Sequence, residues 1–210
     1  MQKLLLLLLL MASSNSVLAL GAAGHETVCE IAFNELTAKA KTAVLEIMKN
    51  EEDERFKTFR DACVWPDYPG AAANARKPDH YINLPRNWYY IKYEKCVESD
   101  TCLFTAIRQD ESVLKNPNSS NEDKLESLKC LGHWIGDIHQ PLHISFKDDR
   151  GGNEIELKNG IGCNKKLHAV WDTCIFEDQL KEDGFTTDSD GREKYGKYLQ
   201  STITQSQRDQ

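Results

Sequence analysis

The residues of this 210-residue chain that could carry chemistry centre on the segment 125–143, LESLKCLGHWIGDIHQPLH. His133 and Asp137 are four residues apart, so on a helix both side chains leave one face, one turn apart. Pro141 cannot continue a regular helix, so the helix should end just before it, and His143 follows the break. Imidazole nitrogens and carboxylate oxygens are ligands that zinc sites use. A single helical histidine is more often structural, but this combination favours a metal site.

Candidate ligands recur elsewhere in the chain. His168 and Asp172 form a second pair with the same spacing, and His25, His80 and Asp67 lie near the start of the chain or in its loops. Ligands scattered over several helices and loops are what a multinuclear site inside a helical bundle requires. Each pair alone favours a structural role, whereas all of them in one small chain favour metal binding.

The spacing of apolar residues predicts the elements that position these side chains. We expect a helix over 26–36, a second helix that begins after its N-cap Thr37, and a third over 101–114. The central segment should form a helix that begins with a capping box at Ser119 and Glu122, and a further helix should cover 167–180. Residues 66–79 should be a loop, 81–93 irregular or briefly extended, and 154–158 a short strand or hairpin arm. The tail from Lys181 is polar and only weakly periodic. The prediction is one mostly α domain, a multi-helix bundle around a trinuclear zinc cleft with at most a small β-hairpin.

The first 19 residues have the pattern of a secretory signal peptide. Lys3 supplies positive charge, Leu4 to Ala12 form an apolar run, and Ala19 ends a cleavage site. Cleavage there would leave a domain of residues 20–210 that begins at Leu20. The apolar run is too short to span a bilayer, and no second long one follows. We therefore expect a secreted or periplasmic protein without stable membrane insertion.

Seven cysteines in an exported chain predict disulfides. Cys96 and Cys102 are close enough to close a small loop, and Cys163 with Cys174 is another candidate pair. Because seven is odd, at least one thiol is free or has its partner outside this chain, and Cys29, on the apolar face of a helix, is our candidate for a buried thiol. The remaining connectivity stays open.

The formal net charge of −7 argues against a generic basic surface for nucleic acids. It does not exclude an enzyme that acts on nucleic acids, because bound zinc ions would add local positive charge that this count omits.

The motifs together resemble those of the secreted, zinc-dependent single-strand nucleases of the S1/P1 type, a family distantly similar to zinc-dependent phospholipase C. They are LGAAGH at 20–25, WPD at 65–67, HYINLP at 80–85, HxxxDxxxPLH at 133–143, RGGN at 150–153 and HAVWD at 168–172. No one of these motifs is specific alone. The resemblance implies three zinc ions, single-stranded DNA or RNA and 3′-nucleotides as substrates, products with a 5′-phosphate, and a monomer.

The resemblance also implies a ligand set. The first zinc would be held by Asp67, His80, His133 and Asp137; the second by His143, His168 and Asp172; the third by His25, Asp137 and the free amine and carbonyl of Leu20. Asp67 and Asp137 would be catalytic by holding the metal-activated water, and Asn153 and Asn83 would contact substrate. The family usually has Trp at the mature first residue, but Leu20 offers the same main-chain ligands.

Two other interpretations stay open. Phospholipase C enzymes place Glu, not Asp, four residues after the corresponding His, so Asp172 favours the nuclease. A non-catalytic exported zinc-binding protein would have a complete ligand set with bound zinc and no phosphodiesterase activity. Family members usually continue further than Gln210, so we expect the domain at 20–210 to lack C-terminal helices.

Overall fold

A computed structural model describes residues 21–88, 90–91, 96–161 and 163–209. The first half of the described chain holds the helices α1 (Ala22–Glu35), α2 (Ala38–Met48), α3 (Phe59–Ala62), α4 (Leu103–Lys115) and α5 (Asn121–Ile138). The second half holds α6 (Leu167–Ala169), α7 (Ile175–Glu182), α8 (Ser189–Thr202) and α9 (Gln205–Arg208). The prediction of a mostly helical fold is confirmed.

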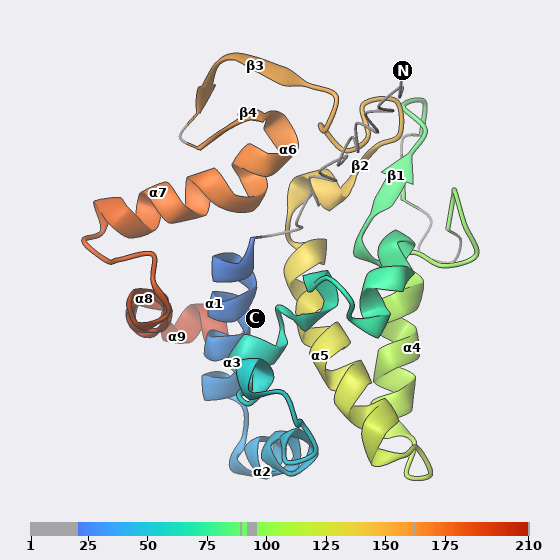
Figure 1. Cartoon of the computed structure of the whole chain (residues 1–210), viewed down its shortest axis with the longest axis vertical. Coiled ribbons are helices and arrows are strands. Elements are labelled where there is room, and N and C mark those ends of the chain that lie inside the picture. The colour runs from blue at the N-terminus through green and yellow to red at the C-terminus, as the bar shows by residue number, and fades with distance from the viewer. Residues whose placement is uncertain (1–20, 89, 92–95, 162, 210) are drawn as a thin grey trace, which may run out of the picture.

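The centre of the bundle is the pair α4 and α5, which lie side by side with α1 on the far side of α5 (Figure 1). One hydrophobic cluster lies between α4, α5 and strand β1, and it includes Leu103, Phe104 and the fully buried Trp134. A second cluster, around Met48, Phe56 and Leu128, fills the space between α2 and α5. These two clusters hold α5 in place from both sides.

Short strands accompany the helices. β1 (Ile82–Leu84) pairs in parallel with β2 (Ile144–Phe146), in the register Asn83 opposite Ser145. β3 (Glu156–Ile161) and β4 (Asn164–Lys166) form an antiparallel hairpin, as predicted for this region. The parallel pair was not predicted, because three residues are too few to show a period.

Several helix ends and turns differ from the prediction. α1 begins at Ala22, four residues earlier than expected, and the N-cap of α5 is Ser120, whose side chain accepts from the amide of Asp123. Thr37 caps α2 as predicted. The expected loop at 66–79 contains the 3₁₀ segments η2 (Trp65–Asp67) and η3 (Ala72–His80). Another, η4 (Pro141–His143), follows the break that Pro141 imposes on α5.

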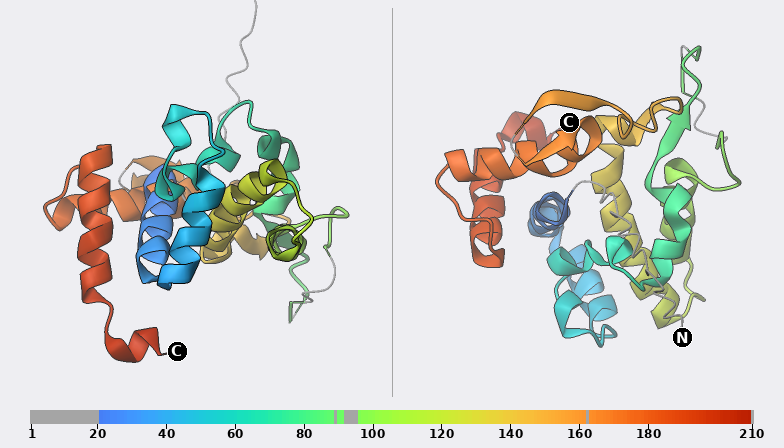
Figure 2. Two further views of the ribbon diagram at one scale, coloured as in Figure 1. Left: turned by 90° about the horizontal axis from the view of Figure 1, so that it is seen from below. Right: turned by 45° about the horizontal axis from the view of Figure 1, so that its top comes forward.

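The expected single helix over 167–180 is interrupted by a π-helical turn, η5 (Val170–Cys174), and continues to Glu182. The polar tail, whose weak periodicity predicted no particular element, forms α8 and α9, and α8 packs along α1 (Figure 2).

The disulfides correct one prediction. Cys96–Cys102 and Cys163–Cys174 are present as expected. Cys29, our candidate for a free thiol, is instead bonded to Cys63 and joins α1 to the end of α3. The free cysteine is Cys130, which is buried in α5. A pattern of apolar neighbours identifies a buried cysteine but cannot show whether a partner faces it.

Candidate metal centre

Eight side chains predicted as metal ligands lie together where α1 begins and α5 ends. The helices α1, α5 and α6, the segments η2, η3 and η4, and the π turn η5 each contribute at least one of them. None is more than 8% exposed, although all are polar or charged. They are His25, Asp67, His80, His133, Asp137, His143, His168 and Asp172.

These side chains form three groups whose ligand atoms lie within 4.8 Å of one another. The groups are His25 with His133 and Asp137, Asp67 with His80 and His133, and His143 with His168 and Asp172. The ligands of a tetrahedral zinc ion at about 2.0–2.1 Å lie about 3.3 Å apart. The observed spacings, such as 3.2 Å between His133 Nε2 and His80 Nδ1 and 3.2 Å between His168 Nε2 and Asp172 Oδ2, fit that geometry.

Asp137 connects the groups. Its Oδ1 lies 3.4 Å from His25 Nε2 and 3.5 Å from His143 Nδ1, and its Oδ2 lies 3.2 Å from His80 Nδ1. Neither oxygen has a hydrogen-bond partner within the described chain. A buried carboxylate without hydrogen bonds is costly unless something else neutralises it. The position and both open oxygens suit a carboxylate that bridges two ions.

Other atoms of the cluster also lack hydrogen-bond partners among the described residues. They include both ring nitrogens of His25, Nε2 of His143 and Oδ2 of Asp172. Because buried polar atoms are nearly always paired, several orphaned atoms converging on one place indicate a ligand. Nitrogen and carboxylate oxygen in groups of three are the donor set of zinc. The residues therefore fit the predicted metal.

Backbone carbonyls orient three of the histidines. Nδ1 of His133, His143 and His168 lies 2.6–2.7 Å from the carbonyl oxygens of Cys63, His80 and Gly151, respectively. A carbonyl can only accept, so each Nδ1 carries a proton, and Nε2 is the ring nitrogen left to face a metal ion. This arrangement prepares Nε2 as a metal ligand.

The RGGN motif supplies one of these carbonyls. Arg150, Gly151 and Gly152 all have positive φ angles, of 53°, 63° and 80°. A Cβ on Gly151 would lie 2.5 Å from the carbonyl oxygen of Leu142, so this position requires glycine. The turn thereby holds the Gly151 carbonyl against His168.

Gln140 is a site residue that the sequence reasoning missed. Its side chain is buried, donates to Oδ1 of Asp172 and accepts from the amide of Leu142. The backbone of Asp172 is also held by a hydrogen bond, because its carbonyl accepts from the amide of Gly21 at 2.6 Å. A glutamine between a helix end and Pro-Leu-His carries no pattern that would reveal this contact.

Burial and the close charges shift several pKa values. Burial raises the pKa of Asp67 to about 6. Burial and the neighbouring His25 hold the pKa of His133 well below its usual value. Burial by itself would raise the pKa of Asp137, but the surrounding histidines, above all His133, hold that pKa well below its usual range. Asp137 is therefore a carboxylate and His133 a neutral imidazole, the forms that bind metal.

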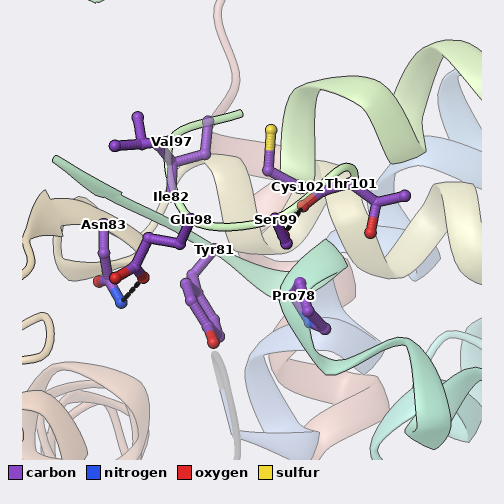
Figure 3. A pocket seen from close by; sticks show the side chains of 9 residues that line it. All are labelled: Pro78, Tyr81, Ile82, Asn83, Val97, Glu98, Ser99, Thr101 and Cys102. Atoms are coloured by element: carbon purple, nitrogen blue, oxygen red, sulfur yellow. Dashed lines mark hydrogen bonds between the residues drawn. The ribbon is translucent and has the colours of Figure 1, made fainter. Parts of the chain in front are cut away.

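Three further predicted residues are not members of the metal groups found among the described residues. Leu20 is not among the described residues. Asn153 is partly exposed, directly after the glycine turn, and its amide donates to the carbonyl of Arg150 at 2.8 Å. Asn83 is not part of the metal groups. It lines a cavity of about 250 Å³ and donates to Glu98 at 2.9 Å (Figure 3).

Within the described ranges, no helix combines the length and the apolar character needed to cross a membrane.

Comparison with known proteins agrees with the geometry of the site. The family model described as S1/P1 Nuclease matches residues 20–210. Endonuclease 4 of Arabidopsis thaliana is 34% identical over 182 residues, which cover 80% of this chain and 58% of that protein. Nuclease S1 of Aspergillus oryzae is 31% identical over 165 residues, covering 75% and 55% of the two chains. Nuclease P1 of Penicillium citrinum is 30% identical, covering 73% and 57%. The matches thus span little more than half the length of these relatives.

Proposed function

Because the chain belongs to the S1/P1 nuclease family, we propose that it is a zinc-dependent phosphodiesterase of single-stranded DNA and RNA. The products would carry a 5′-phosphate, and 3′-nucleotides would be a second class of substrate. The observation that carries the proposal is the convergence of eight buried His and Asp side chains in three groups, with Asp137 within 3.5 Å of a histidine from each group. We further propose export after cleavage of residues 1–19, a mature domain at 20–210, secreted or periplasmic residence, and a monomer.

Three zinc ions would have distinct holders in this chain. Asp67, His80, His133 and Asp137 would hold the first, and His143, His168 and Asp172 the second. His25 and Asp137 would hold the third, together with the free amine and carbonyl of Leu20. Zinc bound here would neutralise charge on the phosphate oxygens and lower the pKa of a coordinated water.

The chain's own residues would complete the site. Asp67 and Asp137 would act as the catalytic carboxylates by fixing where the attacking water lies. Asn153 follows the turn whose Gly151 carbonyl contacts His168, and it would bind substrate beside the second ion. Asn83 would bind substrate from the neighbouring cavity, three residues after His80 (Figure 3).

The test is an assay of the chain beginning at Leu20 with single-stranded DNA, double-stranded DNA and a 3′-nucleotide, with zinc or with chelator. We expect zinc-dependent loss of the single strand and products with a 5′-phosphate. Asp137→Asn should reduce the rate by more than about 100-fold, because loss of even a supporting group around a metal costs 10–100-fold. Asp123→Asn, on the first turn of the same helix, is the matched control and should retain activity.

Two outcomes would contradict the proposal. Hydrolysis of phosphatidylcholine vesicles with nucleic acids left intact would favour a phospholipase. A folded chain that binds zinc and cleaves neither substrate would favour a non-catalytic zinc-binding protein.

A further inference from the structure

A buried carboxylate, Glu26, directly follows His25 in the first turn of α1. Its Oε2 accepts from Arg60 at 2.5 Å and from Arg192 at 2.7 Å, and its Oε1 accepts from Arg192 at 3.0 Å. Arg60 belongs to α3 and Arg192 to α8. One carboxylate therefore ties the first turn of α1 to two other helices, through charged hydrogen bonds of the strong kind.

His25 differs from the other histidines of the cluster in how it is held. His133, His143 and His168 each donate Nδ1 to a backbone carbonyl. Neither ring nitrogen of His25 has a hydrogen-bond partner among the described residues, and its ring stacks on His133 at 3.7 Å. Its position beside Asp137 therefore depends on where the first turn of α1 lies.

That turn is buried, and apart from His25 the residues beside Glu26 in it carry no ionisable side chain. Gly21, the N-cap of α1, has no side chain to cap the helix, and its amide donates to the carbonyl of Asp172. The Cys29–Cys63 disulfide lies one turn further along. Glu26 is thus the charged anchor at the level of His25.

We propose that Glu26 is a positioning residue for the metal group of His25 and Asp137, acting through Arg60 and Arg192. The inference rests on the proposed function in so far as an ion binds in that group. Removing the charge of Glu26 would leave two arginines, one buried and one partly buried, without their shared partner. The first turn of α1 would then move and carry His25 with it. His80, His143 and His168, which other elements hold, would keep their positions.

The test compares Glu26→Gln with Glu35→Gln. Glu35 lies at the other end of α1 and also binds an arginine, Arg208, through two contacts of 2.9 and 3.1 Å, so it controls for loss of an ion pair on this helix. Native mass spectrometry would count the bound zinc ions, and a chromogenic chelator would follow their release. In Glu26→Gln one ion should leave at least about tenfold faster than in the wild type, and the others at the wild-type rate. Glu35→Gln should match the wild type.

Hydrogen exchange of the metal-free proteins gives a readout that needs neither zinc nor activity. Amides of residues 21–28 should exchange faster in Glu26→Gln, while those of α5 remain unchanged. Wild-type release and exchange in Glu26→Gln, or equal acceleration of all ions, would overturn the inference. If Glu26→Gln does not fold, Arg192→Gln decides in the same way. A wild type that binds no zinc would refute the proposed function, and exchange would still decide the role of Glu26.

Discussion

At the scale of single residues, Asp172 shows how the chain prepares a ligand before any ion arrives. Gln140 donates to Oδ1, which leaves Oδ2 facing His168 at 3.2 Å. The same glutamine accepts from the amide of Leu142, and this fixes the turn that leads to His143. One buried side-chain amide thus orients Asp172 and the turn before His143, which belong to the same metal group. Residues that hydrogen-bond to metal ligands typically have this role.

We expect Gln140→Leu to weaken zinc binding in the group of His143, His168 and Asp172 by about 10–100-fold, because Asp172 and the Leu142 amide lose their partner. Isothermal titration with zinc would measure the change. Gln200→Leu, which removes a half-buried glutamine bonded to Glu35 and remote from the metal groups in the sequence, is the control and should bind zinc as the wild type does. Equal affinities in all three proteins would exclude a role for Gln140.

Cys130 offers a second prediction at this scale. Burial, together with Asp110, raises the pKa of its thiol far above the ordinary value, and the side chain is fully buried. Because the thiolate is the reactive form, a thiol reagent at pH 8 should label no cysteine of the native protein. After denaturation without reductant, one thiol per chain should react. Labelling of Cys29 or Cys63 in the denatured protein would contradict the disulfide between them.

At the scale of elements, α5 approaches α1 and α3 unusually closely at Gly132. A Cβ there would lie 2.4 Å from Cys63 Sγ and 2.8 Å from Cys29 Sγ. The carbonyl of Cys63 also orients His133, the next residue along α5. The glycine and the disulfide therefore set the distance between two elements that carry ligands.

Gly132→Ala should destabilise the protein by about 1–3 kcal/mol through overpacking, despite the better helix propensity of alanine. Chemical denaturation would measure it. Gly196→Ala is the matched control in α8, where the new Cβ would lie 3.3 Å from Cγ of the flexible Glu30 side chain and 3.9 Å from Thr27 Cγ2, so the effect should be near zero. A neutral Gly132→Ala would mean that α5 can shift away from the disulfide freely.

The longest element that sequence reasoning missed is α8. Its buried residues are Gly191, Tyr195 and Gly196, so two of the three add nothing to an apolar period. The helix is held instead by the cap at Asp188, by the pairs Asp190–Lys194 and Glu193–Lys197, and by Arg192. Such contacts stabilise a helix without producing hydrophobic periodicity.

At the scale of the whole molecule, one end of the bundle gathers buried polar groups from seven segments of the chain. The apolar clusters lie between α4, α5, α2 and β1, so they offer no hydrogen bonds to offset the cost of burying these polar groups. Ions bound only by the folded state would add their binding free energy to its stability.

Zinc should therefore raise the melting temperature of the protein. An ion at a concentration 100 times its Kd stabilises by about 2.7 kcal/mol, which corresponds to about 5–10 °C for a domain of this size. Calorimetry with zinc and with chelator would measure the difference. Asp137→Asn, which lacks the shared ligand, should show a much smaller difference. A wild-type melting temperature that is independent of zinc would argue against ions in this cluster.

Local spacing along the chain was enough to predict several features of this protein. The His-x-x-x-Asp pairs, the helix break at Pro141, the cap at Thr37 and the short-range disulfides follow from the geometry of a few consecutive residues. The folded structure was needed to show which ligands face one another, that Cys63 is the partner of Cys29, that Gln140 contacts Asp172, and that Glu26 contacts Arg60. These contacts join segments distant in the chain. Their distances depend on how α1, α5 and α8 pack, and packing leaves no period in the sequence.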